Sequence, residues 1–554
     1  MKSYEFLLSL VYSLYFHAKS FLHKLFNNKS LNNKEFKSKT FSDYLKKNEE
    51  LWSNNKIKYA NGAILVTNFV HQVGYTITEC IIAKNIQSFF KLKIVGLIDY
   101  GDGTGKKILK SFNINDFIEF QGMSFFLRLF YLAKAFKILK KIKNVDEFIS
   151  FSIDEISIGK SVYDHILRHT GIGSINYLYY KFYFYLSEAL YCNDYSKKLF
   201  EKNNFKYMMM AESQFIPSNL IFQNALKFGI KVISRISGPK KIGVRLYSSI
   251  DEKHVAKIRL SNELFDRLFS SNKELYSKKG FISIKNVFDG KADHFDPFSE
   301  KSFIRVQNKE ESIKKLYELF KWDKSKKICA VFSHNLFDGV YLHPWRIFRD
   351  NLVWLRSTLN YIKGLDKNIN WIVKEHPSDY GLKRLKTSTY KEFEKIIGER
   401  DYIKFFPSDY SPSIIKDLAN CVVTSQGTPG LEYPCFGIPS IVGGDTHYTG
   451  FGFTYEPKNM KEYFKFLDNI ESIISNGLNK DQVDRARVNY YITFFLTKVE
   501  HPLLHKYDYN RELDMNNFFN ESIKLLNSYK EKEDIFKKCL RHQLKNNNNH
   551  LLAI

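Results

Sequence analysis

Short apolar runs alternate with helical stretches along most of the chain. In the first half, the runs at 63–69, 91–99, 206–213 and 230–236 have the length and composition of buried strands. Residues 116–205 are mostly helical in pattern and rich in aromatic side chains. Strands that alternate with helices predict a parallel sheet covered by helices.

The second half repeats the alternation. Four more apolar runs predict strands at 326–334, 368–377, 421–425 and 439–444. A polar connection at about 285–312 separates the halves, so we predict an α/β fold with two Rossmann-like domains, at 51–300 and 301–478. Residues 1–50 are predicted to form a helical segment. Residues 479–554 are predicted to form a return helix and a charged tail that is helical and then disordered.

Charge and cysteine content narrow the class of protein. The chain has 554 residues, a net charge of +25 and six cysteines with no C-x-x-C pair. A zinc site and a disulfide framework are therefore not expected, and reduced cysteines indicate the cytoplasm. The positive charge fits a membrane surface, an anionic substrate or an AT-rich genome that inflates lysine and asparagine. No compact Lys/Arg block stands out, and we predict no nucleic-acid partner.

The N-terminal segment carries the longest apolar stretch, "FLLSLVYSLYF" at 6–16. It is shorter than the 18 or so apolar residues that cross a bilayer, and it lacks the small-residue cleavage site of a signal peptide. Basic residues follow it. Two interpretations stay open: the segment lies on a membrane surface, or it packs on the first domain.

The stretch "TSQGTPGLEYPCFGIPSIVGG" (424–444) follows a predicted strand and combines glycines, prolines and hydroxyl side chains. Ser425 is expected at the end of the strand, where its hydroxyl lies beside the helix start, and Gly427 and Gly430 are expected to let backbone N–H groups approach an anion there. Thr428 and Glu432 are four residues apart, so they share a helix face. The stretch therefore predicts a phosphate and sugar site, against the alternative of a plain turn.

A second cluster of candidates ends the neighbouring strands. Lys374 and His376 lie at the end of the run at 368–377, and Asp338 follows the run at 326–334. The carboxyl edge of a parallel sheet is where doubly wound folds bind ligands. A histidine there can donate to a phosphate oxygen or protonate a leaving group. Asp338 can orient a hydroxyl or simply cap a turn.

The remaining candidates belong to the first domain. Tyr163, Asp164 and Arg168 lie at helical spacing as cleft candidates, and an ordinary pair between Asp164 and Arg168 is the simpler interpretation. Glu212 ends a predicted strand and is the candidate acid of this domain. The segment "GDGTGKK" (101–107) lacks the spacing of a phosphate-binding P-loop and is predicted to be a turn.

The order of motifs in the second half resembles a known family. The motifs are "SHNLFDG" (333–339), "VKEHP" (373–377), the stretch 424–444 and "HYTGFGFTYEP" (447–457). They resemble those of bacterial capsule and surface-polysaccharide glycosyltransferases, including the β-Kdo transferases. The resemblance implies the GT-B architecture, with two facing Rossmann-like domains and no metal. It implies that His376, Ser425, Gly427 and Thr428 contact donor phosphate and that Glu432 holds the donor ribose.

The function implied by the resemblance is transfer of a sugar from a nucleotide-sugar, with Kdo from CMP-Kdo favoured, to a glycan or lipid-linked glycan. No cofactor and no metal are expected, and no Asp-x-Asp pair occurs. The expected location is the cytoplasm, at the inner face of the membrane. Three alternatives remain: a nucleotide-sugar 2-epimerase, a polyol-phosphate transferase and a non-catalytic polysaccharide-assembly protein.

Overall fold

The computed structural model describes residues 2–26, 34–53, 58–238, 241–291, 303, 308–380, 386–505, 514–531 and 534–553. The chain divides into two compact units. Unit 1 comprises Met1–Ile166, Asn176–Lys253 and Thr497–Ile554, and unit 2 comprises Leu167–Ile175 and His254–Leu496. The divisions at residues 254 and 496 differ from the predicted boundaries at 300 and 478. The difference arises because one helix that precedes the strands of the second sheet in sequence packs against another that follows them, and both belong to unit 2.

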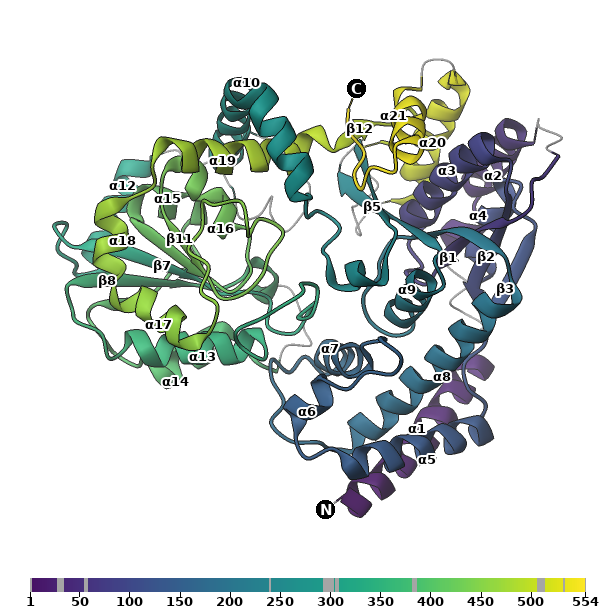
Figure 1. Ribbon diagram of the computed structural model, residues 1–554, viewed down its shortest axis with the longest axis horizontal. Coiled ribbons are helices and arrows are strands. Elements are labelled where there is room, and N and C mark those ends of the chain that lie inside the picture. Colours follow the sequence, from purple (N-terminus) through teal and green to yellow (C-terminus); the bar gives the residue numbers. More distant parts are fainter. Residues whose placement is uncertain are drawn as a thin grey trace. The chain divides into compact units, whose positions relative to one another are not determined.

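Unit 1 contains a seven-stranded sheet (Figure 1). Its strands are β1 (Ala63–Asn68), β2 (Lys93–Asp99), β3 (Asp116–Phe120), β4 (Phe205–Met210), β5 (Lys231–Gly238), β6 (Lys241–Tyr247) and β12 (Lys498–Glu500), in the order β12-β6-β5-β4-β1-β2-β3. The strands β5, β4, β1, β2 and β3 are parallel, and β6 and β12 add an antiparallel edge. The chain leaves β1 toward β2 and later returns to its other side as β4, so the strand order reverses between β1 and β4.

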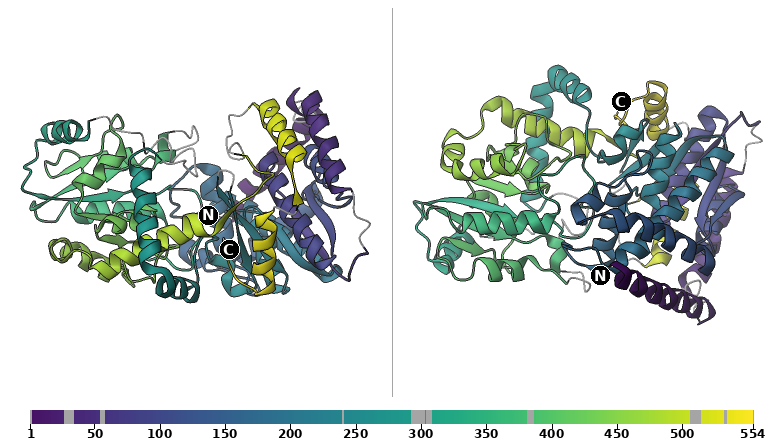
Figure 2. Two further views of the ribbon diagram at one scale, coloured as in Figure 1. Left: turned by 90° about the horizontal axis from the view of Figure 1, so that it is seen from above. Right: turned by 60° about the horizontal axis from the view of Figure 1, so that its bottom comes forward.

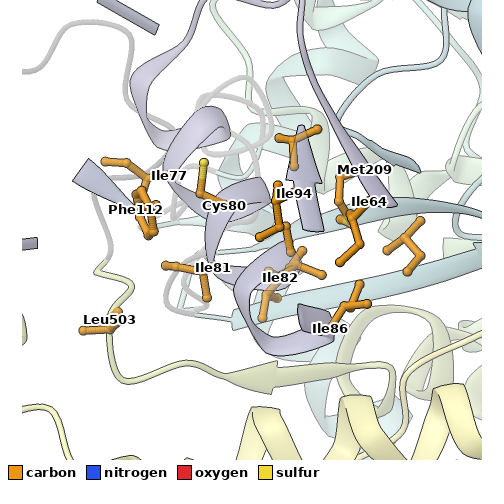
Figure 3. Packing of buried hydrophobic residues seen from close by; sticks show 14 of the residues in the cluster. Ile64, Ile77, Cys80, Ile81, Ile82, Ile86, Ile94, Phe112, Met209 and Leu503 are labelled. Atoms are coloured by element: carbon orange, nitrogen blue, oxygen red, sulfur yellow. The ribbon is translucent and has the colours of Figure 1, made fainter. Parts of the chain in front are cut away.

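The apolar core of unit 1 covers one face of this sheet (Figure 3). The helices on this face are α2 (Lys39–Trp52), α3 (Val73–Phe90), α4 (Gly103–Ser111), α20 (Met515–Ser528) and α21 (Ile535–Lys545). Ile64 of β1, Ile94 of β2 and Met209 of β4 point toward Ile81 and Ile82 of α3. The continuous apolar runs of the parallel strands thus form the centre of the sheet, as buried strands require.

The C-terminal segment is part of this core. In Figures 1 and 2, α20 and α21 lie beside α2 and α3, although the two pairs of helices come from opposite ends of the sequence. After α21, the backbone N–H of Leu551 donates to Val244 O (3.0 Å), and Leu551 is fully buried. The helical part of the predicted tail is confirmed. The predicted disorder of its asparagine-rich end is wrong, because that end pairs with β6 beyond the residues that β12 covers.

The N-terminal helix α1 (Lys2–Phe26) packs beside α5 (Phe125–Lys141) and α8 (Tyr180–Lys202). Lys2 Nζ donates to Ile142 O (2.7 Å), and Glu5 accepts from the backbone N–H of Tyr180 (2.7 Å). The ring of Tyr12 lies 4.9 Å from that of Phe184. The helix therefore docks on the first unit, as one of the two interpretations expected. No helix in the described part of the chain is both long and apolar enough to cross a bilayer.

Unit 2 contains a five-stranded parallel sheet. Its strands are β7 (Lys327–Phe332), β8 (Ile369–Lys374), β9 (Ile403–Phe405), β10 (Cys421–Thr424) and β11 (Ser440–Val442), in the order β11-β10-β7-β8-β9. The order reverses between β7 and β10. The helices are α10 (Asn262–Phe288), α12 (Lys309–Phe320), α13 (Asn351–Ile362), α14 (Thr389–Ile396), α15 (Ile415–Leu418), α16 (Pro429–Glu432), α17 (Met460–Asp468), α18 (Ile470–Asn476) and α19 (Lys480–Tyr491). Each unit is thus a Rossmann-like α/β fold, as predicted.

The return segment begins in unit 2. Helix α19 (Lys480–Tyr491) packs along α10 (Asn262–Phe288), where Lys273 Nζ lies 2.7 Å from Asp481 Oδ1 and Ser277 donates to Asp484 (2.6 Å). The chain then re-enters unit 1 at Thr497 and adds β12 to its sheet. The predicted return to the first domain is therefore made by a short strand, not by the helix itself.

Candidate functional site

Three loops meet at the carboxyl edge of the sheet in unit 2. They follow β7, β8 and β10, which are adjacent parallel strands, so their carboxyl ends lie together. The strand order reverses between β7 and β10. Such a reversal opens a crevice between the loops on either side of it, and this is the usual ligand position in doubly wound sheets.

The loop after β10 is held by its own hydroxyl groups. The backbone N–H of Gly427 donates to Thr424 Oγ1 (3.2 Å), and Thr424 Oγ1 donates to Phe332 O of β7 (3.2 Å). Ser425 is fully buried and donates to Asn351 Oδ1 (3.1 Å). A Cβ on Gly427 would lie only 2.9 Å from Thr424 Oγ1. The predicted residues Ser425 and Gly427 therefore shape this loop.

Gly430 has a packing role in place of the predicted ligand contact. A Cβ at this position would lie 2.1 Å from the hydroxyl of Tyr448, which donates to Gly427 O (2.5 Å). The backbone N–H of Gly430 donates to Gly427 O (3.1 Å) and is not directed at an open site. The following helix, α16, has only four residues. Few peptide dipoles are aligned there, so side chains must supply most of the attraction for an anion.

Thr428 and Glu432 share one face of α16, as predicted. Thr428 is exposed at the helix start, and its hydroxyl is hydrogen-bonded to the Glu432 carboxyl. Burial raises the pKa of Glu432 to about 7, although the Thr428 hydroxyl opposes this rise. At neutral pH, Glu432 is therefore shared between a hydrogen-bond donor form and an acceptor form.

Arg346 joins the loops after β7 and β10. Its guanidinium donates to Val340 O (2.8 Å), to the side chains of Gln426 and Asn351, and to Ser425 Oγ (3.4 Å). The Nδ2 of Asn351 in turn donates to Asn335 O (2.7 Å). One cation and one amide thus fix the two sides of the crevice. Neither residue is predicted from the sequence, because their partners lie up to 80 positions away.

Two imidazoles lie close together at this edge of the sheet. The ring of His334, after β7, has its centre 5.8 Å from that of His376, after β8. Burial lowers the pKa of His334 to about 4. Burial, with His334 and Lys374 nearby, lowers the pKa of His376 to about 3. His334 Cδ2 is 3.9 Å from the position of a Cβ on Gly427, so the imidazoles adjoin the glycine loop.

Further basic and imidazole groups surround this pair. Lys374 is buried, donates to Glu375 O (2.9 Å) and has a pKa lowered to about 8 by burial. Burial also lowers the pKa of His343, with His447, Arg346 and His334 adding to the effect. A neutral imidazole next to fixed cations is a good donor to an incoming anion. The edge is therefore suited to phosphate or carboxylate oxygens.

The other predicted residues are Asp338 and Arg168 in unit 2, and Tyr163, Asp164 and Glu212 in unit 1. Asp338 pairs with Arg168 at 2.7 Å and so joins the loop after β7 to the end of helix α7 (Ile158–Thr170). Tyr163 is fully buried and Asp164 nearly so. Tyr163 is therefore a core residue and not a cleft residue. Glu212 follows β4 in unit 1, where it affects the ionisation of Tyr247.

Within the described ranges, no group of three or more His, Cys, Asp or Glu side chains is arranged to hold a metal ion. The six cysteines are buried as free thiols. What the site offers to a ligand is thus a set of imidazole, ammonium, guanidinium, hydroxyl and carboxyl groups.

Comparison with known proteins gives structural likeness at a low level. No protein-family model matches the sequence, and no curated protein matches it. Similar solved structures include a β-Kdo 2,4 transferase, KpsC of Thermosulfurimonas dismutans, with 11% identity, 52% of this chain, 80% of that chain and a TM-score of 0.32. A glycosyltransferase from Rickettsia africae has 11% identity over 85% of this chain and all of its own, with a TM-score of 0.27. A UDP-GlcNAc 2-epimerase from Neisseria meningitidis, bound to UDP-GlcNAc, has 12% identity over 78% of this chain and 99% of its own, with a TM-score of 0.26. Likeness at these scores assigns no substrate or reaction to this chain.

Proposed function

We propose that the chain is a glycosyltransferase of surface-polysaccharide biosynthesis that uses a nucleotide-sugar donor and no metal. The observation that carries the proposal is the pair of neutral imidazoles, His334 and His376, beside the glycine loop at the strand-order reversal of unit 2. The motif resemblance favours a CMP-linked donor with Kdo as the sugar and a glycan or lipid-linked glycan as acceptor. Lys374 and Arg346 add positive charge for the donor phosphate.

The proposed chemistry follows the charge that develops on the leaving nucleotide. As the bond between sugar and phosphate breaks, negative charge grows on the phosphate oxygen, and His376 donates a proton or hydrogen bond to it. When the donor binds, the exposed Thr428 hydroxyl exchanges its hydrogen bond to Glu432 for one to a second phosphate oxygen. Glu432 accepts from a ribose hydroxyl one turn further along. An acid of unit 1, for which Glu212 is the positional candidate, removes the acceptor proton.

A 2-epimerase of the same fold would use the same nucleotide contacts. It would consume a nucleotide-sugar without an acceptor, whereas a transferase would need one. Incubating the purified chain with CMP-Kdo or UDP-GlcNAc alone therefore separates the two reactions. A non-catalytic assembly protein would turn over neither donor under any acceptor condition.

The direct test is nucleotide binding to the full chain. A ligand at 100 times its dissociation constant stabilises the protein by about 2.7 kcal/mol, which thermal denaturation detects. We expect CMP to stabilise the chain more than UDP, and Thr428→Val to weaken CMP binding about ten- to a hundredfold, since a charge-assisted hydrogen bond contributes about 1.5–3 kcal/mol. A buried threonine such as Thr358 is unsuitable as the control, because its replacement would disturb the core. Thr454→Val, at a half-buried position that hydrogen-bonds Glu456 outside the crevice loops, is the matched control. Failure of every nucleotide to bind would refute the proposal.

We further propose that α1 holds the protein at an anionic membrane surface. The helix buries Ser9 and Ser13 while it exposes Leu7, Val11 and Leu14 at 54–58%. A helix that packs only on its own domain would not leave this apolar face exposed. The neighbouring helix α5 exposes Phe126 and Phe130 and, toward its end, three lysines at 137, 140 and 141. An apolar face with aromatic and basic residues fits an interfacial helix that binds anionic lipid.

A further inference from the structure

Two neighbouring cavities open at the carboxyl edge of the sheet in unit 1. The smaller, of about 440 Å³, is lined by Asn68, His71 and Asp102, among others. The larger, of about 570 Å³, is lined by residues that include Arg128 and Glu188. Asp99, at the end of β2, and Tyr100 line both cavities. Each volume lies in the range of small-ligand sites, and the shared residues make the two cavities neighbours along one wall.

The smaller cavity presents a carboxylate that is fixed in position. His71 Nε2 lies 2.8 Å from Asp99 Oδ2, and His71 Nδ1 lies 3.5 Å from Asp102 Oδ2. Asp102 also caps α4, since it accepts from Gly105 N (2.9 Å) and from Asn68 Nδ2 (2.7 Å). Asp102 is thus fully engaged, whereas the Asp99 side chain is 37% exposed. Asp99 can accept hydrogen bonds from a ligand that enters either cavity.

The backbone at His71 supports this arrangement. His71 has a φ of 55°, in the left-handed region that residues other than glycine rarely adopt. Hydrogen bonds to Asp102 and Asp99 raise the pKa of His71 to about 10. The imidazolium therefore stays charged at neutral pH and anchors both carboxylates. A strained residue held by two partners is typical of positions with a function.

The larger cavity presents a buried cation with a donor to spare. Arg128 is 3% exposed, donates from Nε to His17 Nε2 (2.9 Å) and from Nη2 to Glu188 Oε1 (3.0 Å). Its guanidinium lies 4.5 Å from the ring centre of Phe184. Within the described part of the chain, Arg128 Nη1 is buried without a hydrogen-bond partner. Buried charged donors rarely stay unsatisfied, and a guanidinium donor matches a carboxylate or phosphate oxygen.

We propose that the two cavities together bind a sugar that carries an anionic group. The sugar hydroxyls would donate to Asp99, and the carboxylate or phosphate would accept from Arg128 Nη1. Tyr100, which is 60% exposed, supplies an aromatic face for the ring between them. In the proposed glycosyltransferase this ligand would be the acceptor, and that assignment alone rests on the proposed function. Glu212 is not among the described residues that line the two cavities, so binding of the sugar at this site does not depend on the role proposed for Glu212.

The test compares three probes that differ only in their charged group: glucose, glucuronate and glucose 6-phosphate. Binding to the full chain is measured by ligand-detected NMR and by titration calorimetry. We expect one or both anionic sugars to bind about ten- to a hundredfold more tightly than glucose, as a charge-assisted hydrogen bond allows. A preference for glucuronate identifies the carboxylate as the natural group, and a preference for glucose 6-phosphate identifies the phosphate.

Variants assign the binding to these side chains. Asp99→Asn should weaken binding of the anionic sugar at least tenfold, and Arg128→Lys should reduce the difference between anionic and neutral sugars. Tyr100→Ala, at an exposed position, tests the site without disturbing the core. Asp116→Asn is the control, because Asp116 is also an exposed carboxylate (51%) and lies at the start of β3, on the opposite edge of the sheet.

Nucleotide binding to unit 2 is measured on the same samples. The inference is overturned if none of the sugars binds, if all three bind equally, or if Asp99→Asn and Tyr100→Ala bind like the wild type. Loss of nucleotide binding with sugar binding intact would refute the proposed function and leave this site standing. Nucleotide binding without sugar binding would do the opposite.

Discussion

Replacing Glu432 by glutamine should stabilise unit 2 and weaken ligand binding at the same time. Glu432 lies half-buried on α16, where burial raises its pKa from an ordinary 4.5 to about 7. Above pH 7, the folded chain therefore keeps a carboxylate in surroundings that disfavour its charge. Glutamine has almost the same shape, can still accept from Thr428, and carries no charge.

The size of the effect follows from the two ionisation states. An acid whose pKa is raised by folding lowers stability as the pH rises from its unfolded pKa, near 4.5, through its folded pKa, near 7. At about 1.4 kcal/mol per pKa unit, ionisation costs the fold at most about 3 kcal/mol at pH 8. Glu432→Gln should recover that free energy at pH 8 and change little at pH 4.5. For a unit of this size, the expected rise in Tm at pH 8 is at most roughly 10 °C.

Differential scanning calorimetry at both pH values measures this effect. A chain with two units need not unfold in one transition, so the transition that shifts on adding CMP identifies unit 2. The binding of CMP and of cytidine to the variant should weaken together, because the proposed contact is with ribose. A lower Tm at pH 8 would contradict the burial argument. A higher Tm with unchanged cytidine binding would show that the acid is buried for some other reason.

Three further outcomes are expected. Nucleotide binding should take up protons and strengthen as the pH falls, because bound phosphate raises the depressed pKa of His376. Calorimetry in buffers of different ionisation enthalpy measures the proton uptake. If His376→Ala takes up as many protons as the wild type, His376 does not have this role. The double variant Leu7→Glu and Val11→Glu should lose binding to phosphatidylglycerol vesicles while its circular dichroism spectrum is unchanged. Leu275→Glu on α10 is the control at an exposed leucine. The membrane assignment would be refuted if the wild type does not bind these vesicles, or if it forms a dimer that only the double variant dissociates. Turnover should survive EDTA, and an absolute need for Mg²⁺ would contradict the proposed mechanism.

The sequence predicted the parallel centre of both sheets but not their edges. β1 and β7 are continuous apolar runs, which buried strands require, and such runs are visible without knowledge of their neighbours. β3 is half-exposed, β9 has three residues, and β12 is formed far from its sheet in sequence. These strands depend on a partner that the local pattern does not reveal. The sequence predicts disorder for the asparagine-rich end because the local pattern does not reveal its pairing with β6, which orders it.

The candidate site was predictable to the extent that it follows strand ends. His376, Thr428 and Asp338 lie at one edge of unit 2 because parallel strands end together. Arg346 lies outside any regular element, and nothing in its local sequence indicates that it joins two loops. Gly430 shows the reverse case, in which a glycine expected to approach a ligand makes room for a tyrosine ring.

Histidines in the two units respond to opposite surroundings. His334 and His376 lie near Lys374 and Arg346, and burial keeps them neutral. His71 lies between two carboxylates, which keep it charged. An anion that reaches the first pair supplies the negative charge that those imidazoles lack, so its binding must be coupled to proton uptake. A sugar that reaches Asp99 meets an ion cluster that is already protonated, so its binding should leave the proton count of His71 unchanged. The number of protons taken up therefore distinguishes ligands of the two sites even when both bind to one chain.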